Sequence, residues 1–274
     1  MSASASDLPP PPVVGELIAS SGTVLVRGET DSRVLHAWLG GAFGELLLYD
    51  IVSGAAITGP PPGTKGRPKD LTIVMLRLRA WEALYLAFDT QPPRLRIVAV
   101  PPTDASTKVA SVFATAEAAA AAAASAAPSL DLATSWKSLR EVEPHLPQLH
   151  AAYKALRAAG WLIRDGLKFG YDFSLYDGTS PSHMHALLGC LVLTREGAGE
   201  CNWLCLQRHS RVCHGVGKGL LLCSVEPAAA MLADGAVDEV AHVAQLELGP
   251  LPMEVSTMRI DGWDPGKEHA AHSY

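Results

Sequence analysis

The residues best suited to chemistry are a tyrosine, two histidines and a lysine in the second half of the chain. They are Tyr176, His183, His185 and Lys218. Such groups can cleave an RNA phosphodiester without a metal. One removes the proton of the ribose 2′-hydroxyl, a second protonates the departing 5′-oxygen, and the cation stabilises the charge on the phosphorane. Each of these residues by itself is common on protein surfaces or in cores. Only their occurrence together suggests this chemistry.

A set of cysteines and one histidine offers zinc-ligand types every four residues: Cys201, Cys205, His209 and Cys213. On a helix these side chains form one stripe about 18 Å long, at about 1.5 Å per residue. Zinc ligands must all lie within about 2.3 Å of the ion. The spacing therefore predicts a core-facing helix stripe and not a metal site.

Two further patterns bear on cofactors. On a strand, His183 and His185 point to the same side and could ligate a metal, although no carboxylate cluster stands near to complete the shell. This keeps a metal-dependent hydrolase open as an alternative. The glycine-rich stretch 215–219 lacks the Walker A pattern, because Val212 stands where the first glycine is required and Gly219 follows the lysine. We expect no nucleotide at this stretch and no cofactor.

Composition limits the classes of protein. The chain has 274 residues, of which 48% are hydrophobic and 18% charged, enough for two modest domains. No apolar run approaches the roughly 20 residues of a membrane helix. The net charge of −6 argues against loose nucleic-acid binding, but residues 151–223 carry eight Lys and Arg against five Asp and Glu. Five cysteines without a signal peptide predict a reducing compartment, cytosol or nucleus.

The order of elements predicts an α/β protein. Residues 1–15 are expected to be a disordered tail, 16–100 a small α/β domain, and 101–130 an alanine-rich linker or insertion. The first domain is expected to contain strands at 23–27 and 95–100, a helix at 31–39, and helical spacing over 71–88.

A second α/β domain is predicted over 131–265, followed by a tail at 266–274. Its expected helices span 136–142, 150–159 and 201–214, and its expected strands 171–176, 185–194, 220–225 and 254–263. Turns such as the one at 177–178 are too short for crossover helices, so mixed strand pairing is expected.

The arrangement of these residues resembles the tRNA-splicing endonuclease family. The family carries a tyrosine at the end of a Gly-x-Asp-Phe-like strand, a histidine shortly after it, and a lysine before an apolar strand. Here these are Tyr176 after residues 170–173, His183 or His185, and Lys218 before residues 219–223. The sequence is most similar to the catalytic subunit for the 5′ splice site, through residues 153–170, 24–31, 41–44 and 258–263.

The resemblance implies a mixed α/β nuclease domain and metal-independent transesterification, leaving a 2′,3′-cyclic phosphate and a 5′-hydroxyl. Tyr176 would be the general base, a histidine the general acid, and Lys218 the cation that activates the phenol and stabilises the transition state. The family's usual spacing from the tyrosine falls between His183 and His185. The alanine after His185 favours that residue.

The resemblance also implies how RNA and partners are bound. Arg211 and Trp263 would hold a flipped-out intron base between a guanidinium and an indole. The expected substrate is precursor tRNA, cut at its 5′ exon–intron junction by a heterotetramer of splicing-endonuclease subunits in the nucleus. The loop 177–182 lacks the basic and aromatic residues common in relatives, so substrate positioning is expected to differ. An alanine-rich insertion stands in place of the long basic insertion that some relatives carry, so RNA affinity is expected to depend on partner subunits. The alternative is a non-catalytic structural subunit of the same assembly.

Overall fold

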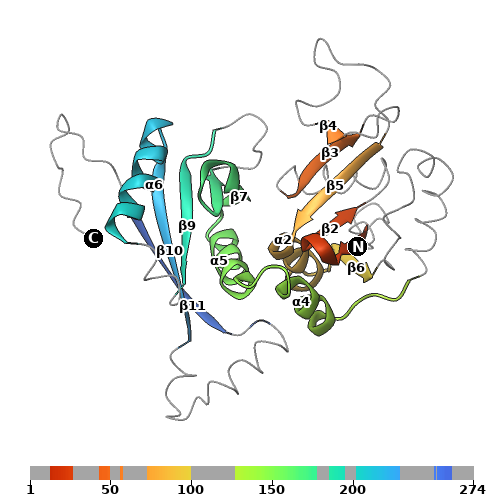
Figure 1. The fold of residues 1–274 in the computed structure, drawn as a ribbon. Helices are drawn as coiled ribbons and strands as arrows, with labels where there is room; N and C mark the ends of the chain where they lie inside the picture. The colour runs from red at the N-terminus through yellow and green to blue at the C-terminus, as the bar shows by residue number, and fades with distance from the viewer. Residues whose placement is uncertain are drawn as a thin grey trace, which may run out of the picture.

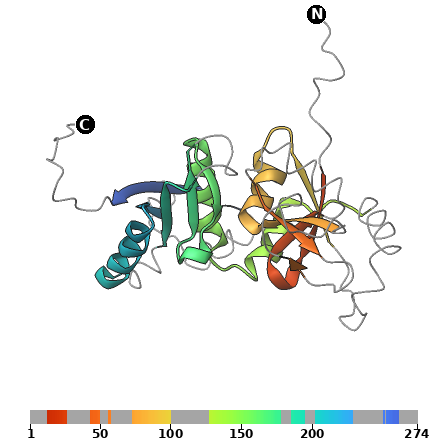
Figure 2. The ribbon, with the colours of Figure 1, turned by 90° about the horizontal axis from the view of Figure 1, so that it is seen from above.

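The structure is a computed structural model that contains two β-sheets with helices between them (Figures 1 and 2). It describes residues 13–26, 43–49, 56–57, 73–99, 127–177, 185–194, 202–228, 250 and 252–260. The expected helix at 31–39 and the alanine tract at 101–126 lie outside these ranges. The α/β class expected from the sequence is confirmed. No helix in the described ranges has the length and apolar character needed to cross a membrane.

The first sheet has six strands in the order β4-β3-β5-β2-β1-β6. They are β1 (Val13–Ile18), β2 (Thr23–Val26), β3 (Glu45–Tyr49), β4 (Ala56–Ile57), β5 (Ile73–Arg79) and β6 (Leu95–Ala99). All pairs are antiparallel except β1 with β6, which are parallel. The strands expected near residues 23 and 95 are confirmed. β1 begins at Val13, inside the segment expected to be a disordered tail.

The helix expected over 71–88 is wrong in its first half. β5 fills residues 73–79 and pairs with β2 and β3, and only then does the chain turn into α2 (Ala80–Leu84) and a π-helical turn, η3 (Tyr85–Asp89). Leu76 and Leu78 are fully buried, while Arg77 and Arg79 between and after them are partly exposed. That alternation has the period of a strand, and pairing on both sides outweighed the helical spacing of the longer window.

The second sheet has five strands in the order β11-β10-β9-β8-β7. They are β7 (Leu162–Asp165), β8 (Phe173–Tyr176), β9 (Leu188–Thr194), β10 (Gly219–Pro227) and β11 (Met253–Ile260). β9 and β10 are parallel, and the other neighbours are antiparallel. Parallel neighbours need a crossover, and α6 (Trp203–Gly215) lies in this connection. The mixed pairing expected from the short turns is confirmed.

Two helices lead into this sheet. α4 (Leu132–Arg140) begins after Asp131, whose side chain accepts a hydrogen bond from the Thr134 N–H at 2.8 Å. α5 (Leu146–Ala158) begins earlier than the expected residue 150, with Pro147 in its first turn, where proline costs no hydrogen bond. It ends before Gly160, which has φ 88°.

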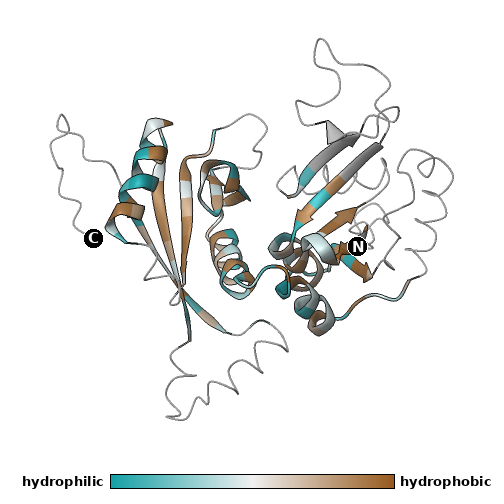
Figure 3. Cartoon of the chain, in the orientation of Figure 1, coloured by the Kyte–Doolittle hydropathy of each residue, from teal (hydrophilic) through white to brown (hydrophobic). Residues whose placement is uncertain are grey.

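The two sheets share one continuous hydrophobic core through α2, α4 and α5, which lie between them (Figure 1). Phe173 of β8 meets Trp81 of α2 edge to face, with ring centroids 5.6 Å apart, and meets Tyr153 of α5 at 6.2 Å. α6 covers the opposite face of the second sheet over a smaller cluster that contains Leu220 and Leu222. Figure 3 shows apolar colour along much of β9 and β10. The expected domain boundaries stay a prediction.

A buried polar junction joins the two halves beside this core. The Glu82 carboxylate accepts the N–H groups of Gly44 at 3.1 Å and Arg79 at 2.9 Å. Burial raises the pKa of Glu82, although both hydrogen bonds act to lower it. Arg79 forms an ion pair with Asp165 of β7, and Arg164 donates to the Gly44 carbonyl. These contacts join the end of β7 to the first sheet.

Asp89 connects the end of η3 to α5. Its carboxylate lies 2.9 Å from His150 Nε2 and 2.5 Å from Lys154 Nζ. Burial alone would raise the pKa of Asp89, but the hydrogen bonds from His150 and Lys154 outweigh it and hold that pKa below its ordinary value of 3.8. The charged carboxylate therefore stabilises the fold above this value, and the stabilisation is lost as the pH falls through the lowered pKa.

We predict that Asp89→Asn lowers the free energy of unfolding by about 1–2 kcal/mol at pH 7, because the hydrogen bonds to a charged partner are weakened and exposed Lys154 is screened by solvent. The difference from the wild type should shrink below about pH 4. Urea titrations at pH 7 and pH 3.5 measure it. An equal difference at both values would show that the charge of Asp89 is not the stabilising feature.

Candidate active site

Three of the predicted catalytic residues lie at one edge of the second sheet. Tyr176 is the last residue of β8, His185 precedes β9, and Lys218 directly precedes β10. β8 runs antiparallel to β9, and β9 runs parallel to β10. The end of β8 and the beginnings of β9 and β10 are therefore neighbours at this edge, although Tyr176 and Lys218 are distant in sequence.

Strand register places Tyr176 and Lys218 in one cross-strand row. The Leu187 N–H donates to the Leu175 carbonyl at 2.8 Å, and the Leu187 carbonyl accepts from the Gly219 N–H at 3.0 Å. Extending the pairing of β8, β9 and β10 by one residue puts Tyr176, Leu187 and Lys218 side by side. Residues in one row share a face, and the outer two are about 10 Å apart at two strand spacings. The row therefore brings the backbones of Tyr176 and Lys218 within two strand spacings. The Tyr176 side chain packs against the main core, and the Lys218 ammonium contacts Tyr171 of the smaller cluster.

No hydrogen bond directly joins Tyr176, His185 and Lys218, all of which the structure describes. Tyr176 is half-buried and packs against the main core, where its register partner is buried Leu162. His185 is exposed, and β9 starts only at Leu188 instead of the expected residue 185. His183 lies outside the described residues, so the choice between the two histidines stays a prediction.

The backbone of Lys218 is fixed by the way α6 ends. Gly217 adopts φ 68°, its N–H donates to the His214 carbonyl at 3.0 Å, and the Lys218 N–H donates to the Cys213 carbonyl at 2.8 Å. This pair of bonds around a left-handed glycine is the Schellman motif. The glycine-rich stretch that does not fit a phosphate loop thus ends α6. It places Lys218 directly before β10.

The ammonium of Lys218 lies among aromatic rings. Its Nζ donates to the Tyr171 hydroxyl at 3.2 Å and lies 4.3 Å from the centroid of the Phe169 ring. Neither aromatic residue was among the predicted site residues. Phe169 closes the short turn η5 (Leu167–Phe169), and Gly170 at φ 81° reverses the chain toward Tyr171. No local sequence pattern predicts the contact of Lys218 with Phe169 and Tyr171, because this contact depends on strand order.

The helix stripe on α6 is only partly core-facing. Cys213 is buried in the smaller cluster, whereas Cys205 and His209 are half-buried and line a pocket. Burial chiefly lowers the pKa of His209, and nearby Arg208 adds to this effect. Cys201 lies outside the described residues. Within the described ranges, no three His, Cys, Asp or Glu side chains gather closely enough to hold a metal ion.

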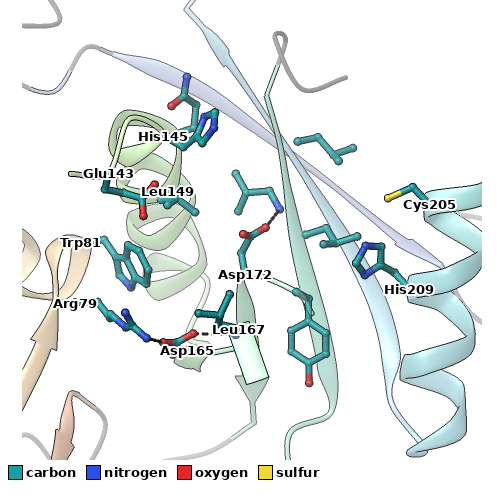
Figure 4. A pocket seen from close by; sticks show the side chains of 15 residues that line it. Arg79, Trp81, Glu143, His145, Leu149, Asp165, Leu167, Asp172, Cys205 and His209 are labelled. Atoms are coloured by element: carbon teal, nitrogen blue, oxygen red, sulfur yellow. Dashed lines mark hydrogen bonds and ion pairs between the residues drawn. The ribbon is translucent and has the colours of Figure 1, made fainter. Parts of the chain in front are cut away.

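The pocket, of about 450 Å³, lies between α6, the corner of α4 and α5, and the end of β5 (Figure 4). Asp172 projects from the sheet toward it and accepts the Val192 N–H at 2.7 Å. Burial raises the pKa of Asp172, although that hydrogen bond lowers it. Tyr171 also lines the pocket, but Tyr176, His185 and Lys218 do not. The pocket therefore does not include the three predicted catalytic residues at the sheet edge.

The predicted base-stacking pair is described only in part. Arg211 is exposed on α6 and lines a shallow groove of about 270 Å³ with Trp203 and Ile260. Ile260 is the last described residue of β11, and Trp263 lies outside the described ranges. The groove places an exposed guanidinium beside an indole that the sequence analysis did not single out.

Comparison with known proteins connects this sheet edge to one family. Residues 148–230 match the family model of the tRNA intron endonuclease catalytic C-terminal domain. The tRNA-splicing endonuclease subunit SEN2 of Eremothecium gossypii is 34% identical over 134 residues, covering 46% of this chain and 35% of that protein.

Relatives from plants and archaea match a shorter stretch. Sen2-1 of Arabidopsis thaliana, a tRNA-splicing endonuclease subunit, is 31% identical over 91 residues, covering 33% of this chain and 38% of its own. The tRNA-splicing endonuclease of Methanococcus maripaludis is 34% identical over 88 residues, covering 32% of this chain and 45% of its own. The chain thus spans less than half the length of these relatives. The matched segment, residues 148–230, contains Tyr176, His183, His185 and Lys218 and is similar to the catalytic C-terminal domain of tRNA intron endonucleases.

Proposed function

We propose that this chain is a catalytic subunit of a tRNA-splicing endonuclease that cuts precursor tRNA at the 5′ exon–intron junction. The observation that supports the proposal is that Tyr176 ends β8, His185 precedes β9 and Lys218 precedes β10, so that the three residues lie at the same end of neighbouring strands. SEN2 and Sen2 proteins among the relatives support the choice of subunit.

The proposed reaction is internal transesterification. Tyr176 takes the proton of the ribose 2′-hydroxyl, the 2′-oxygen attacks the adjacent phosphorus, and the bond to the 5′-oxygen breaks. His185 donates a proton to that 5′-oxygen, and the Lys218 ammonium stabilises the negative charge on the phosphorane. The products are a 2′,3′-cyclic phosphate and a 5′-hydroxyl. Each step uses a side chain of this chain and no cofactor.

The proposal includes a heterotetramer with other splicing-endonuclease subunits and residence in the nucleus. Relatives that are named as subunits of a tRNA-splicing endonuclease support an assembly. Among the described strands, β11 is the terminal strand of the second sheet, with β10 as its neighbour, and an edge strand of this kind can pair with a strand of another chain. Arg211 is proposed to contact the intron, with Trp263 as its stacking partner.

The test uses the complex purified through a tag on the full chain, with precursor tRNA labelled at its 5′ end. His185→Ala and Lys218→Ala are each expected to lower 5′-junction cleavage about 10²–10³-fold while cleavage at the 3′ junction continues. His183→Ala is tested beside them to assign the general acid: cleavage retained in His183→Ala assigns this role to His185, and loss in His183→Ala alone assigns it to His183. Wild-type product should carry a cyclic phosphate that resists alkaline phosphatase until it is opened by acid.

Two results would contradict the proposal. Unchanged 5′-junction cleavage in both variants would identify the chain as a structural subunit. Loss of wild-type cleavage in excess chelator, restored by a divalent cation, would indicate a metal-dependent hydrolase, for which the His183 and His185 pair would be the candidate ligands.

A further inference from the structure

The Lys218 ammonium is held by three contacts to two stacked aromatic rings. Its Nζ is 3.2 Å from the Tyr171 hydroxyl, 4.3 Å from the Phe169 ring centroid and 5.9 Å from the Tyr171 ring centroid. The two rings are themselves stacked, with centroids 5.7 Å apart and planes inclined by 18°. Both cation–π attraction and a hydrogen bond therefore act on one ammonium.

Tyr171 is locked in its own position by two glycines. A Cβ added to Gly166 would lie 2.3 Å from Tyr171 Cδ2, and a Cβ added to Gly189 would lie 2.7 Å from Tyr171 Cε1. The ring thus occupies a slot that only glycine leaves open on both sides, and Tyr171 is 3% exposed. The ring is thus confined between Gly166 and Gly189, and this packing fixes the position of its hydroxyl.

The aromatic partners of Lys218 suit an ammonium that must stabilise negative charge on a phosphate. A carboxylate at this place would neutralise Lys218, whereas a phenol oxygen and ring faces attract the ammonium without cancelling its charge. Within the described ranges no carboxylate lies at ion-pair distance from Lys218. An ammonium has three N–H donors. The bond to Tyr171 uses one and leaves two for phosphate oxygens.

We propose that Tyr171, assisted by Phe169, is a positioning residue that holds the Lys218 ammonium at the catalytic edge before RNA binds. The proposal rests on the nuclease function proposed above. Lysine has a long, flexible stem, and electrostatic stabilisation of a transition state is largest when the charge is already in place. Tyr171 acts only through Lys218 and touches no reacting atom.

The test measures single-turnover cleavage by the full complex, with enzyme in excess over precursor tRNA. Tyr171→Phe keeps the ring in its slot and removes only the hydroxyl, and Phe169→Leu removes a ring face at a half-exposed position. Each should lower the cleavage rate about tenfold, the equivalent of one hydrogen bond to a charged group. RNA affinity and melting temperature should stay near wild type. Tyr153→Phe is the matched control, since the buried Tyr153 hydroxyl has no hydrogen-bond partner among the described residues.

A double-mutant cycle separates positioning from general damage. In a Lys218→Ala background, Tyr171→Phe should cause no further loss, because the group that it positions is absent. The same tenfold loss in both backgrounds would overturn the proposal and assign Tyr171 a purely structural role. A wild-type rate in Tyr171→Phe, when Lys218→Ala has lost cleavage, would also overturn it while leaving the nuclease function intact. Full cleavage by Lys218→Ala would instead overturn the nuclease function itself.

Discussion

Tyr176→Phe is expected to lower the rate of 5′-junction cleavage about 10²–10⁴-fold, the usual contribution of general acid–base catalysis. The substitution keeps the ring that packs beside Leu162 and the main core, and removes only the hydroxyl that would accept the 2′-proton. Stability should therefore change little. The rate is measured in single turnover with the assembled complex, and the dissociation constant for precursor tRNA is measured by gel shift.

If Tyr176 acts only in the chemical step, the cleavage rate should fall while the dissociation constant for precursor tRNA stays unchanged. The dissociation constant should stay within about twofold, because a group that acts in the transition state contributes little to ground-state binding. Tyr85→Phe is a suitable control, since Tyr85 is also half-buried and stacks on Phe43, with ring centroids 6.1 Å apart, far from this edge in the first half of the chain. If Tyr176→Phe cleaves as fast as this control, Tyr176 is not the general base.

Phe173→Ala is expected to lower the free energy of unfolding by about 3–5 kcal/mol. Phe173 is fully buried and contacts α2 through Trp81 and α5 through Tyr153. The cavity would open where the core passes from one sheet to the other. Because small and medium-sized proteins have only about 5–15 kcal/mol of total stability, this is a large part of what holds the chain folded.

The same variant tests whether the two halves unfold together. A core that is continuous across both sheets predicts one cooperative transition, so hydrogen exchange in β2 and β10 should accelerate in parallel. Phe173→Leu, which keeps most of the volume, should cost only about 1 kcal/mol. Exchange that accelerates in β10 while β2 keeps its wild-type protection would show two independently stable domains.

Local sequence signals predicted most of the elements around the candidate site. The helix expected over 150–159 ends at Ala158, before Gly160, and the apolar runs near 173, 190 and 222 form strands of the second sheet. The failure over residues 73–79 has a physical cause. A short apolar window fits both a helix and a strand, and pairing with two distant strands decided between them.

The types of the catalytic candidates and their order along the chain were determined by the sequence alone, because residue chemistry and local spacing are properties of the sequence. Only the tertiary structure decided that Tyr176 and Lys218 share a row, that Tyr171 receives the Lys218 ammonium, and that one core joins both sheets. These features depend on strand order and register between segments far apart in the chain. Such contacts form only when distant strands pair, and no local pattern records which strands will be neighbours.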